Sequence, residues 1–359
     1  MDARPLSHPG TGIYRYTREL LLRMCEMGGQ WYFYSPQAYD KSEFASDNIV
    51  HRMLSTPAFL GGSQASQLLF PYWARRDGIE LFWGPRHHLP ILLPSRINTV
   101  LTVHDLVWQK HGGSMRASRR MVERLLMPGS LRRAGKVVTV SEFIASELSV
   151  AFPDVSSRLS VIHSGSGFRR VAPAPVNAGT ASDYFLFVGT MEPRKNLARL
   201  LRAYQSYVQR CPDAKKLRVV GGDGWGGVDP TRLVADLALQ DMVQIEGKIS
   251  DERLAQLYAG AHALVMPSIY EGFGLPVVES LAHGVPAIIS RDSALSEVAG
   301  AAGYAIEPLS EESICDALLA LTLERTTYER LCASASRRGA DFDWDRSAKL
   351  MFGLLRDWK

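Results

Sequence analysis

SIYEGFGLPVVESLAHGVPAI, residues 268–288, carries two glutamates eight positions apart, Glu271 and Glu279. Between them lie Gly272-Phe273-Gly274 and then Leu275-Pro276. Proline suits the first position of a helix, where its missing N–H leaves no bond unmade. The N–H groups of Gly274 and Leu275 are then free to face a ligand, and the helix dipole favours an anion such as phosphate. This stretch therefore predicts a phosphate-binding loop between a strand and a helix.

The sequence around this loop alternates between short apolar runs and helical patterns. It predicts strands at 184–188, 217–220, 242–246, 262–266 and 285–289, and helices at 196–208, 230–239, 251–260, 277–283 and 293–299. Continuous apolar strands separated by helices are typical of a parallel sheet with helices on both faces. The second half of the chain is therefore expected to be a doubly wound α/β domain.

The first half alternates less regularly, with a predicted helix at 13–27 and strands near 31–34, 81–83, 98–103, 136–140 and 159–162. We expect a Rossmann-like domain at 1–165 and a second one at 183–342. Between them lies a hinge at 166–182 that is rich in Gly, Ser, Pro and Ala. A terminal helix at 343–359 is expected to cross back to the first domain. Ligands of such sheets bind beyond the carboxyl ends of the strands, so a site in a cleft would draw on both domains.

Length and composition limit the class of protein to which the chain can belong. The 359 residues are enough for two domains. No apolar run approaches the ~20 residues of a membrane span, and the four cysteines lack the spacing of a zinc site or a disulfide framework, which fits a cytoplasmic protein. The net charge is +4, but residues 1–170 hold 21 basic and 13 acidic residues (+8), and the remainder hold 20 and 24 (−4). This asymmetry indicates either an acidic partner for the first half or simply a charged surface.

The two glutamates indicate what else the ligand carries. A carboxylate repels phosphate but accepts two hydrogen bonds from a vicinal diol, so Glu271 and Glu279 are expected to bind hydroxyl groups. Positive charge is available at Arg194 and Lys195, between the strand at 184–188 and the next helix. Such side chains bind a diphosphate and stabilise it as it leaves. Together, these features predict a site for a nucleotide-diphosphate sugar.

The chain resembles the retaining glycosyltransferases of family 4, which have the α/β GT-B fold of two Rossmann-like domains facing each other across a cleft. The resemblance rests on E-G-F-G-L-P-x-x-E at 271–279 and on further motifs in the family's order: G-T-G-I-Y-R-Y-T-R-E-L at 10–20, T-V-H-D-L at 102–106, V-V-T-V-S-E-F at 137–143, G-T-M-E-P-R-K-N at 189–196 and F-D-W at 342–344. The sequence looks most like bacterial mannosyl- and rhamnosyltransferases of surface-polysaccharide assembly.

This resemblance implies a role for each residue. Glu279 would bind the ribose, Glu271 the donor sugar, and His104 would lie under that sugar. Donor binding would also involve Gly12, Ile249, Gly272, Phe273, Gly274 and Leu275, and the catalytic residues would be His104, Arg194, Lys195 and Glu271. The implied mechanism is front-face: the leaving diphosphate oxygen takes the proton of the acceptor.

The implied function is transfer of a hexosyl group, with retention, to a lipid-linked or oligosaccharide acceptor in polysaccharide or O-antigen biosynthesis. We expect no metal ion, no other cofactor and no nucleic-acid partner. GDP-mannose is the expected donor, and GDP-rhamnose or a UDP-sugar remains open. A nucleotide-sugar epimerase of the same architecture and a non-catalytic nucleotide-sugar-binding subunit also remain open.

Several other segments have competing interpretations. Residues 115–136 hold seven basic residues and one acid, which predicts either a solvated helix face or a peripheral contact with anionic lipid at the inner face of the cell membrane. Asp343 and Asp345 stand at the start of a predicted helix at 345–357 and are interpreted as a cap rather than a metal site. His87 and His88 could contact the acceptor, but they are interpreted as loop residues.

Overall fold

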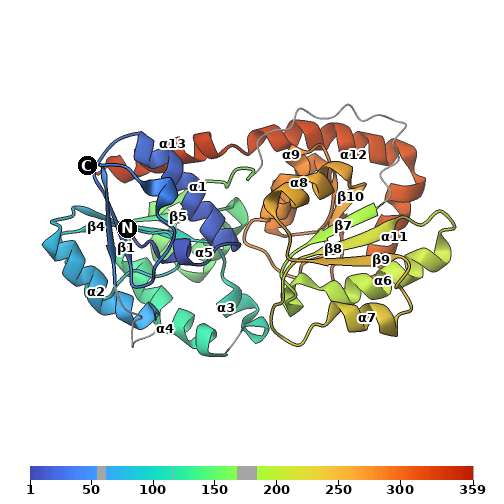
Figure 1. Ribbon diagram of the computed structural model, residues 1–359, viewed down its shortest axis with the longest axis horizontal. Helices are drawn as coiled ribbons and strands as arrows, with labels where there is room; N and C mark the ends of the chain where they lie inside the picture. Colours follow the sequence, from blue (N-terminus) through green and yellow to red (C-terminus); the bar gives the residue numbers. More distant parts are fainter. Residues whose placement is uncertain (55–61, 116, 168–183, 359) are drawn as a thin grey trace. The chain divides into compact units, whose positions relative to one another are not determined.

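The computed structural model describes residues 1–54, 62–115, 117–167 and 184–358 (Figure 1). The chain divides into two compact units, one formed by Met1–Gly165 with Asp343–Lys359 and the other by Ser166–Phe342. Apart from its first two residues, the predicted hinge at 166–182 lies outside the described residues.

The second unit contains a six-stranded parallel sheet in the order β12-β11-β10-β7-β8-β9. Its strands are β7 (Tyr184–Val188), β8 (Lys216–Val220), β9 (Val243–Gly247), β10 (Ala263–Met266), β11 (Ala287–Ser290) and β12 (Gly303–Ile306). All except β12 overlap predicted strands. The chain winds outward from β7 through β8 and β9, and then in the other direction through β10, β11 and β12. The direction changes between β7 and β10, and such a switch point is where open α/β sheets bind ligands.

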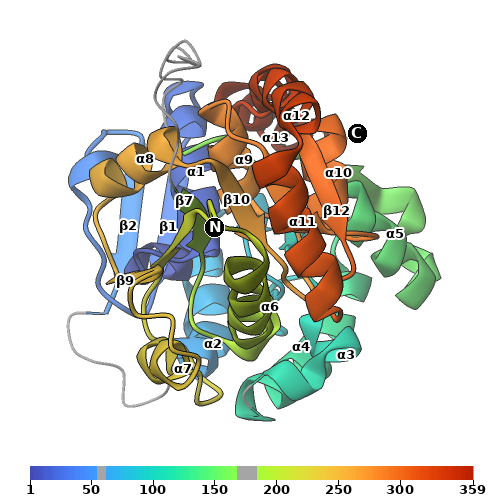
Figure 2. The ribbon, with the colours of Figure 1, turned by 90° about the vertical axis from the view of Figure 1, so that its right-hand side faces the viewer.

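Amphipathic helices cover this sheet. They are α6 (Leu197–Arg210), α7 (Pro230–Asp236), α8 (Asp251–Gly260), α9 (Leu275–Ala282), α10 (Ala294–Ala299), α11 (Glu311–Leu323) and α12 (Arg325–Arg338). Helix α6 buries Leu197, Leu200, Leu201 and Tyr204, the face that the 3.6-residue period predicts. It lies beside α11 (Figure 2).

The first unit has a sheet of β3 (Leu81–Gly84), β4 (Asn98–Val103), β5 (Lys136–Thr139) and β6 (Leu159–Val161), and a pair formed by β1 (Trp31–Ser35) and β2 (Ile49–Met53). Residues 1–3 lie between the two. Ala3 N donates to Tyr34 O at 2.8 Å, and Asp2 N donates to Trp83 O at 3.0 Å. These bonds connect β1 and β3 through the first three residues, of which Asp2 forms an isolated parallel bridge with Tyr34.

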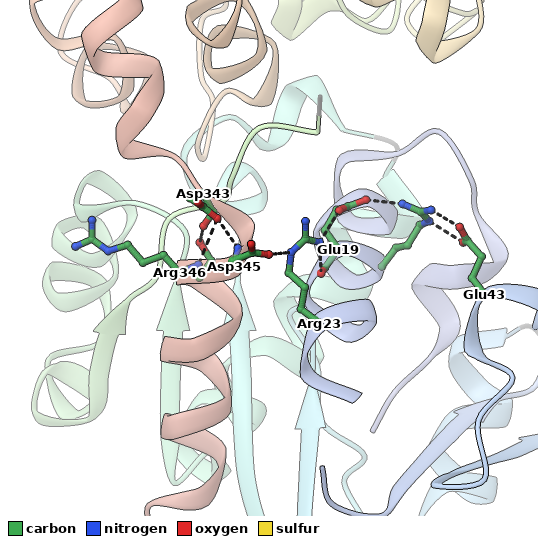
Figure 3. A network of polar contacts seen from close by, with 8 residues as sticks. Glu19, Arg23, Glu43, Asp343, Asp345 and Arg346 are labelled. Carbon is green, nitrogen blue, oxygen red and sulfur yellow. Dashed lines mark hydrogen bonds and ion pairs between the residues drawn. The ribbon is translucent and has the colours of Figure 1, made fainter. Parts of the chain in front are cut away.

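Helices of the first unit are α1 (Gly12–Glu26), α2 (Gly62–Arg76), α3 (Val107–Lys110), α4 (Ala117–Arg133), α5 (Glu142–Ala151) and α13 (Trp344–Arg356). Helix α13 packs against α1. Asp343 caps α13 by accepting hydrogen bonds from the N–H groups of Asp345 and Arg346, and Asp345 pairs with Arg23 of α1 (Figure 3). The capping interpretation of this acidic segment is therefore confirmed.

Candidate active site

The loops that follow β7 and β10 meet at the switch point of the second unit. Lys195 Nζ lies 2.6 Å from Glu271 Oε1, and Arg194 Nη1 lies 2.6 Å from Glu271 Oε2. Arg194 Nη1 also donates to the carbonyl of Tyr270 at 2.7 Å. The predicted cations and one of the predicted acids therefore form a single ion-paired group, which we call the Glu271 triad.

The main chain around the triad is fixed by Asn196. This residue has a left-handed backbone (φ 64°), which asparagine tolerates better than most residues. Its Nδ2 donates to the carbonyls of Pro267 at 3.0 Å and Pro308 at 2.7 Å. In addition, Ile269 N donates to Arg194 O at 2.9 Å. These bonds hold the two loops together, although sequence reasoning gave Asn196 no separate role.

The charges of the triad determine its protonation. Burial by itself would raise the pKa of Glu271, which is 7% exposed, but the neighbouring Arg194 and Lys195 outweigh it and lower that pKa to about 2. The carboxylate is therefore ionised at neutral pH and is ion-paired with both cations. A diphosphate that binds the same cations must compete with Glu271 for them.

A third loop supports the triad. Glu192 Oε1 accepts from Arg194 Nη2 at 2.5 Å, and Glu192 Oε2 accepts from Trp225 Nε1 at 3.0 Å. A Cβ atom at Gly221 would lie 1.8 Å from the carbonyl oxygen of Gly189, so only glycine fits there. The glycine-rich segment after β8 is therefore a turn that packs closely on the loop after β7.

Helix α9 begins at Leu275, two residues earlier than predicted. Gly274 is its N-cap residue, with φ 108°, and its carbonyl accepts from the N–H groups of Val277 and Val278. Pro276 therefore occupies the second helical position and not the first, because the positive φ of Gly274 lets the helix start directly after it. Gly272 and Phe273 are buried, and Phe273 contacts Phe342 edge-to-face with ring centroids 5.9 Å apart.

Glu279 is the second of the two predicted acids. It lies in the second turn of α9, is only 2% exposed and accepts a hydrogen bond at Oε2 from Tyr258 Oη of α8 at 2.8 Å. Sequence reasoning missed Tyr258, because no spacing signal connects α8 to α9. Ile249, the predicted base contact, follows β9 and is half-buried.

In the first unit, His104 follows the carboxyl end of β4. Its Nε2 lies 2.7 Å from the carbonyl oxygen of Pro85, which can only accept, so Nε2 carries the proton. Burial lowers the pKa of His104 to about 4. The ring is therefore neutral at pH 7 and keeps Nδ1 as an acceptor. Tyr16 packs edge-on against it at 4.8 Å.

Asp105 and Gly12 of the same unit have simpler local contacts. Asp105 Oδ1 accepts from the N–H of Val107, the first residue of α3, at 3.1 Å. Gly12 is the exposed first residue of α1, whose N-cap Thr11 accepts from Tyr14 N through its side chain. Gly12 and His104 lie on elements of the same unit, and the Glu271 triad and Glu279 lie on elements of the other.

Two family models match nearly all of this chain. Glycosyltransferase Family 4 matches residues 10–166, and Glycosyl transferases group 1 matches residues 169–338. The protein therefore belongs to the glycosyltransferases that combine these two domains. Its architecture is the GT-B fold that the sequence predicted.

Individual relatives agree with this assignment. The chain is 28% identical to O-antigen chain mannosyltransferase B of Escherichia coli, over 95% of its own length and 94% of the relative's. It is 25% identical to O-antigen chain mannosyltransferase RfbU of Salmonella typhimurium, over 99% and 98% of the two chains. Among solved structures, the Anabaena protein HepE in complex with UDP-glucose matches with a TM-score of 0.74 and 15% identity, covering 98% of each chain. That last likeness shows the fold alone.

Proposed function

We propose that this glycosyltransferase moves a hexosyl group from a nucleotide-diphosphate sugar to a lipid-linked or oligosaccharide acceptor in polysaccharide or O-antigen biosynthesis, with retention at the anomeric carbon. The Glu271 triad carries the proposal. It places two cations and one carboxylate together at the switch point of a doubly wound sheet, beside a glycine loop that begins a helix. A diphosphate needs the cations, and the adjoining sugar hydroxyls need the carboxylate.

Donor binding would exchange the partners within the triad. The diphosphate takes Arg194 and Lys195, and Glu271 turns to the sugar hydroxyls. As the bond to the anomeric carbon breaks, the cations and the amides of the loop stabilise the charge on the diphosphate oxygen, which takes the proton of the acceptor. His104 contributes a neutral ring whose Nδ1 accepts a hydrogen bond from the sugar, and Glu279 holds the ribose.

The donor is proposed to be GDP-mannose, because the two relatives that match over nearly the whole chain carry the name mannosyltransferase. The test is a panel of GDP- and UDP-sugars assayed with and without a lipid extract from polysaccharide-producing cells. Acceptor-dependent release of the nucleoside diphosphate supports the transferase. Isomerisation of the donor without an acceptor would instead indicate an epimerase, and binding without turnover would indicate a nucleotide-sugar-binding subunit.

Transfer is proposed to need no metal ion. Arg194 and Lys195 supply the two positive charges that a divalent cation would otherwise bring to the diphosphate. Treatment with EDTA followed by desalting should leave the rate of transfer within about twofold of the untreated rate, which is a change of under 0.5 kcal/mol. Complete loss of activity that manganese restores would refute this proposal.

The first unit offers a surface for a membrane-bound acceptor. Helix α4 buries Glu123, Met127, Ser130 and Leu131, and it exposes Met121 (56%) and Leu125 (69%) among arginines. Ile91 N donates to Gln67 Oε1 of α2 at 2.8 Å, and Leu89 N donates to Ser130 Oγ of α4. The segment at 89–92 therefore lies against both α2 and α4. The exposed apolar side chains of these three elements are Leu68, Tyr72, Ile91, Leu92, Met121 and Leu125.

We call these six residues, with the exposed Arg119, Arg120 and Arg124, the apolar-basic surface. Exposed apolar side chains together with exposed arginines suit the interface of an anionic bilayer. We therefore propose that the protein works at the inner face of the cell membrane through this surface. Arg116, which belongs to the predicted basic stretch, lies outside the described residues. Within the described parts of the chain, no helix is both long enough and apolar enough to span a membrane.

A further inference from the structure

The loop after β3 holds His104 at two points. The carbonyl of Pro85 accepts from the His104 side chain, and His87 Nε2 accepts from the His104 main-chain N–H at 3.1 Å. A main-chain N–H can only donate, so His87 Nε2 must carry a lone pair and the proton of a neutral His87 must sit on Nδ1. The two histidines therefore have opposite tautomers, both set by their partners.

Glu123 of α4 fixes this loop in turn. Its Oε2 lies 3.3 Å from His87 Nδ1 and 2.9 Å from His88 Nε2. All three side chains are only 4% exposed. A buried carboxylate is costly unless its neighbours donate to it, and here two ring N–H groups do so. Glu123 is the one acidic residue of the basic helix α4, and it is buried while Met121 and Leu125 are exposed.

We propose that His87 and Glu123 are positioning residues for His104, and that protonation of His87 at Nε2 releases the His104 main chain and lowers turnover. Neither residue is assigned to contact the donor. The inference rests on the proposed function for its effect on turnover, but its hydrogen-bond pattern can be measured without any substrate.

The charged groups around His87 determine the pH at which its protonation releases the His104 main chain. They are Glu123 and Arg119 on α4, Arg86 and His88 beside it in the loop, and His104 and Asp105 after β4. Burial lowers the pKa of His87, but the charge of Glu123 and its hydrogen bond outweigh this and raise that pKa above its ordinary value. Turnover should therefore fall as the pH drops through the raised pKa of His87.

Three variants test the turnover effect. His87→Leu removes the acceptor and should lower kcat by about 10- to 100-fold, with the donor KM changed less than about threefold. His87→Gln keeps an acceptor that does not titrate, so it should retain kcat at pH 8. It should also lose the fall in kcat at low pH, which is the acid limb of the pH profile. Glu123→Gln keeps an acceptor oxygen without charge and should move the acid limb to lower pH. The control is His51→Gln on β2, which should leave the limb in place.

Wild-type kcat and an unshifted acid limb in both His87→Leu and Glu123→Gln would overturn the inference. If His87→Leu does not fold, Glu123→Gln decides alone, because it keeps the size and the acceptor oxygen. Nitrogen NMR of the full chain with labelled histidine provides the independent readout. His87 should be the Nδ1–H tautomer, and the Nε2–H tautomer overturns the inference even if transfer is observed. An Nδ1–H tautomer in a protein without transferase activity would count against the proposed function alone.

Discussion

Arg194 and Lys195 hold the two oxygens of the same carboxylate, Glu271, each at 2.6 Å. The residues expected to bind diphosphate and the residue expected to bind sugar are therefore ion-paired with one another before any ligand arrives. The carboxylate offsets part of the repulsion between the two neighbouring cations, and Glu192 pairs with Arg194 as well. If the proposed function holds, the donor displaces an internal partner of the cations, which lowers its apparent affinity and favours ligands that satisfy both the cations and the acid.

Replacing Glu271 with glutamine tests this competition. Glu271→Gln should bind a free nucleoside diphosphate about 3- to 10-fold more tightly, a gain of roughly 1 kcal/mol, because the competing carboxylate is gone. The same variant should lose turnover, since an amide accepts hydroxyl hydrogen bonds less well than a carboxylate. Calorimetry and steady-state kinetics measure the two effects. Glu311→Gln, which breaks an exposed pair with Arg202, is the control, and unchanged or weaker nucleotide affinity in Glu271→Gln would contradict the competition.

Lys195 should matter more for turnover than for binding. Lys195→Ala should lower kcat by about 100-fold, because the ammonium stabilises charge that develops on the leaving diphosphate, and should raise the donor KM by only a few fold. Lys216→Ala, an exposed lysine at the amino end of β8, should behave as wild type. The leaving-group role would be wrong if Lys195→Ala kept its turnover number.

Glu279 and Tyr258 should act together on the nucleotide. Glu279→Ala should weaken the binding of a free nucleoside diphosphate by at least tenfold, because two hydroxyl contacts are lost. Tyr258→Phe removes only the bond that orients the carboxylate and should weaken binding by about 2- to 10-fold, as expected for one hydrogen bond. Calorimetric titration of both variants is the measurement, and wild-type affinity in Glu279→Ala would remove the ribose assignment.

The apolar-basic surface should bind anionic vesicles. Flotation with phosphatidylglycerol vesicles should recover the protein at low salt, and phosphatidylcholine vesicles should not. Changing Arg120 and Arg124 together to glutamine should reduce partitioning by about 30-fold, at about 1 kcal/mol for each charge. Arg325→Gln, an exposed arginine of the other unit, is the matched control. Equal binding to both lipids, or no effect of the double change, would argue against this surface.

The buried strands were the part of the fold most accessible to sequence reasoning. Strands β7, β8, β10 and β11 are continuous apolar runs between helical patterns, and such runs have few other stable arrangements. Strand β12 was missed because its four residues include two that are half-buried and one that is exposed. Helix α2 was missed as well, and it contains Pro71, which interrupts a helical pattern.

The candidate site also has some features that the sequence predicts and others that it does not. The meeting of Arg194, Lys195 and Glu271 follows from their positions after neighbouring parallel strands, which share one edge of the sheet. The ion pairs among these three residues cannot be predicted from those positions, because they depend on the directions of the side chains. The contributions of Asn196, Tyr258 and Glu123 come from contacts between elements with no fixed spacing in the sequence. Glu123 also reverses the usual rule, since this acid is buried while Leu125 on the same helix is exposed.

The last helix has a practical consequence for engineering. Because α13 packs on α1 and Asp345 pairs with Arg23, the segment from Asp343 onward belongs with the first unit although it follows the second. A chimera that takes a new donor specificity from a relative should therefore graft only 166–342 and retain both flanking segments. A single crossover near residue 166 would instead import a foreign tail and leave the outer face of α1 mismatched.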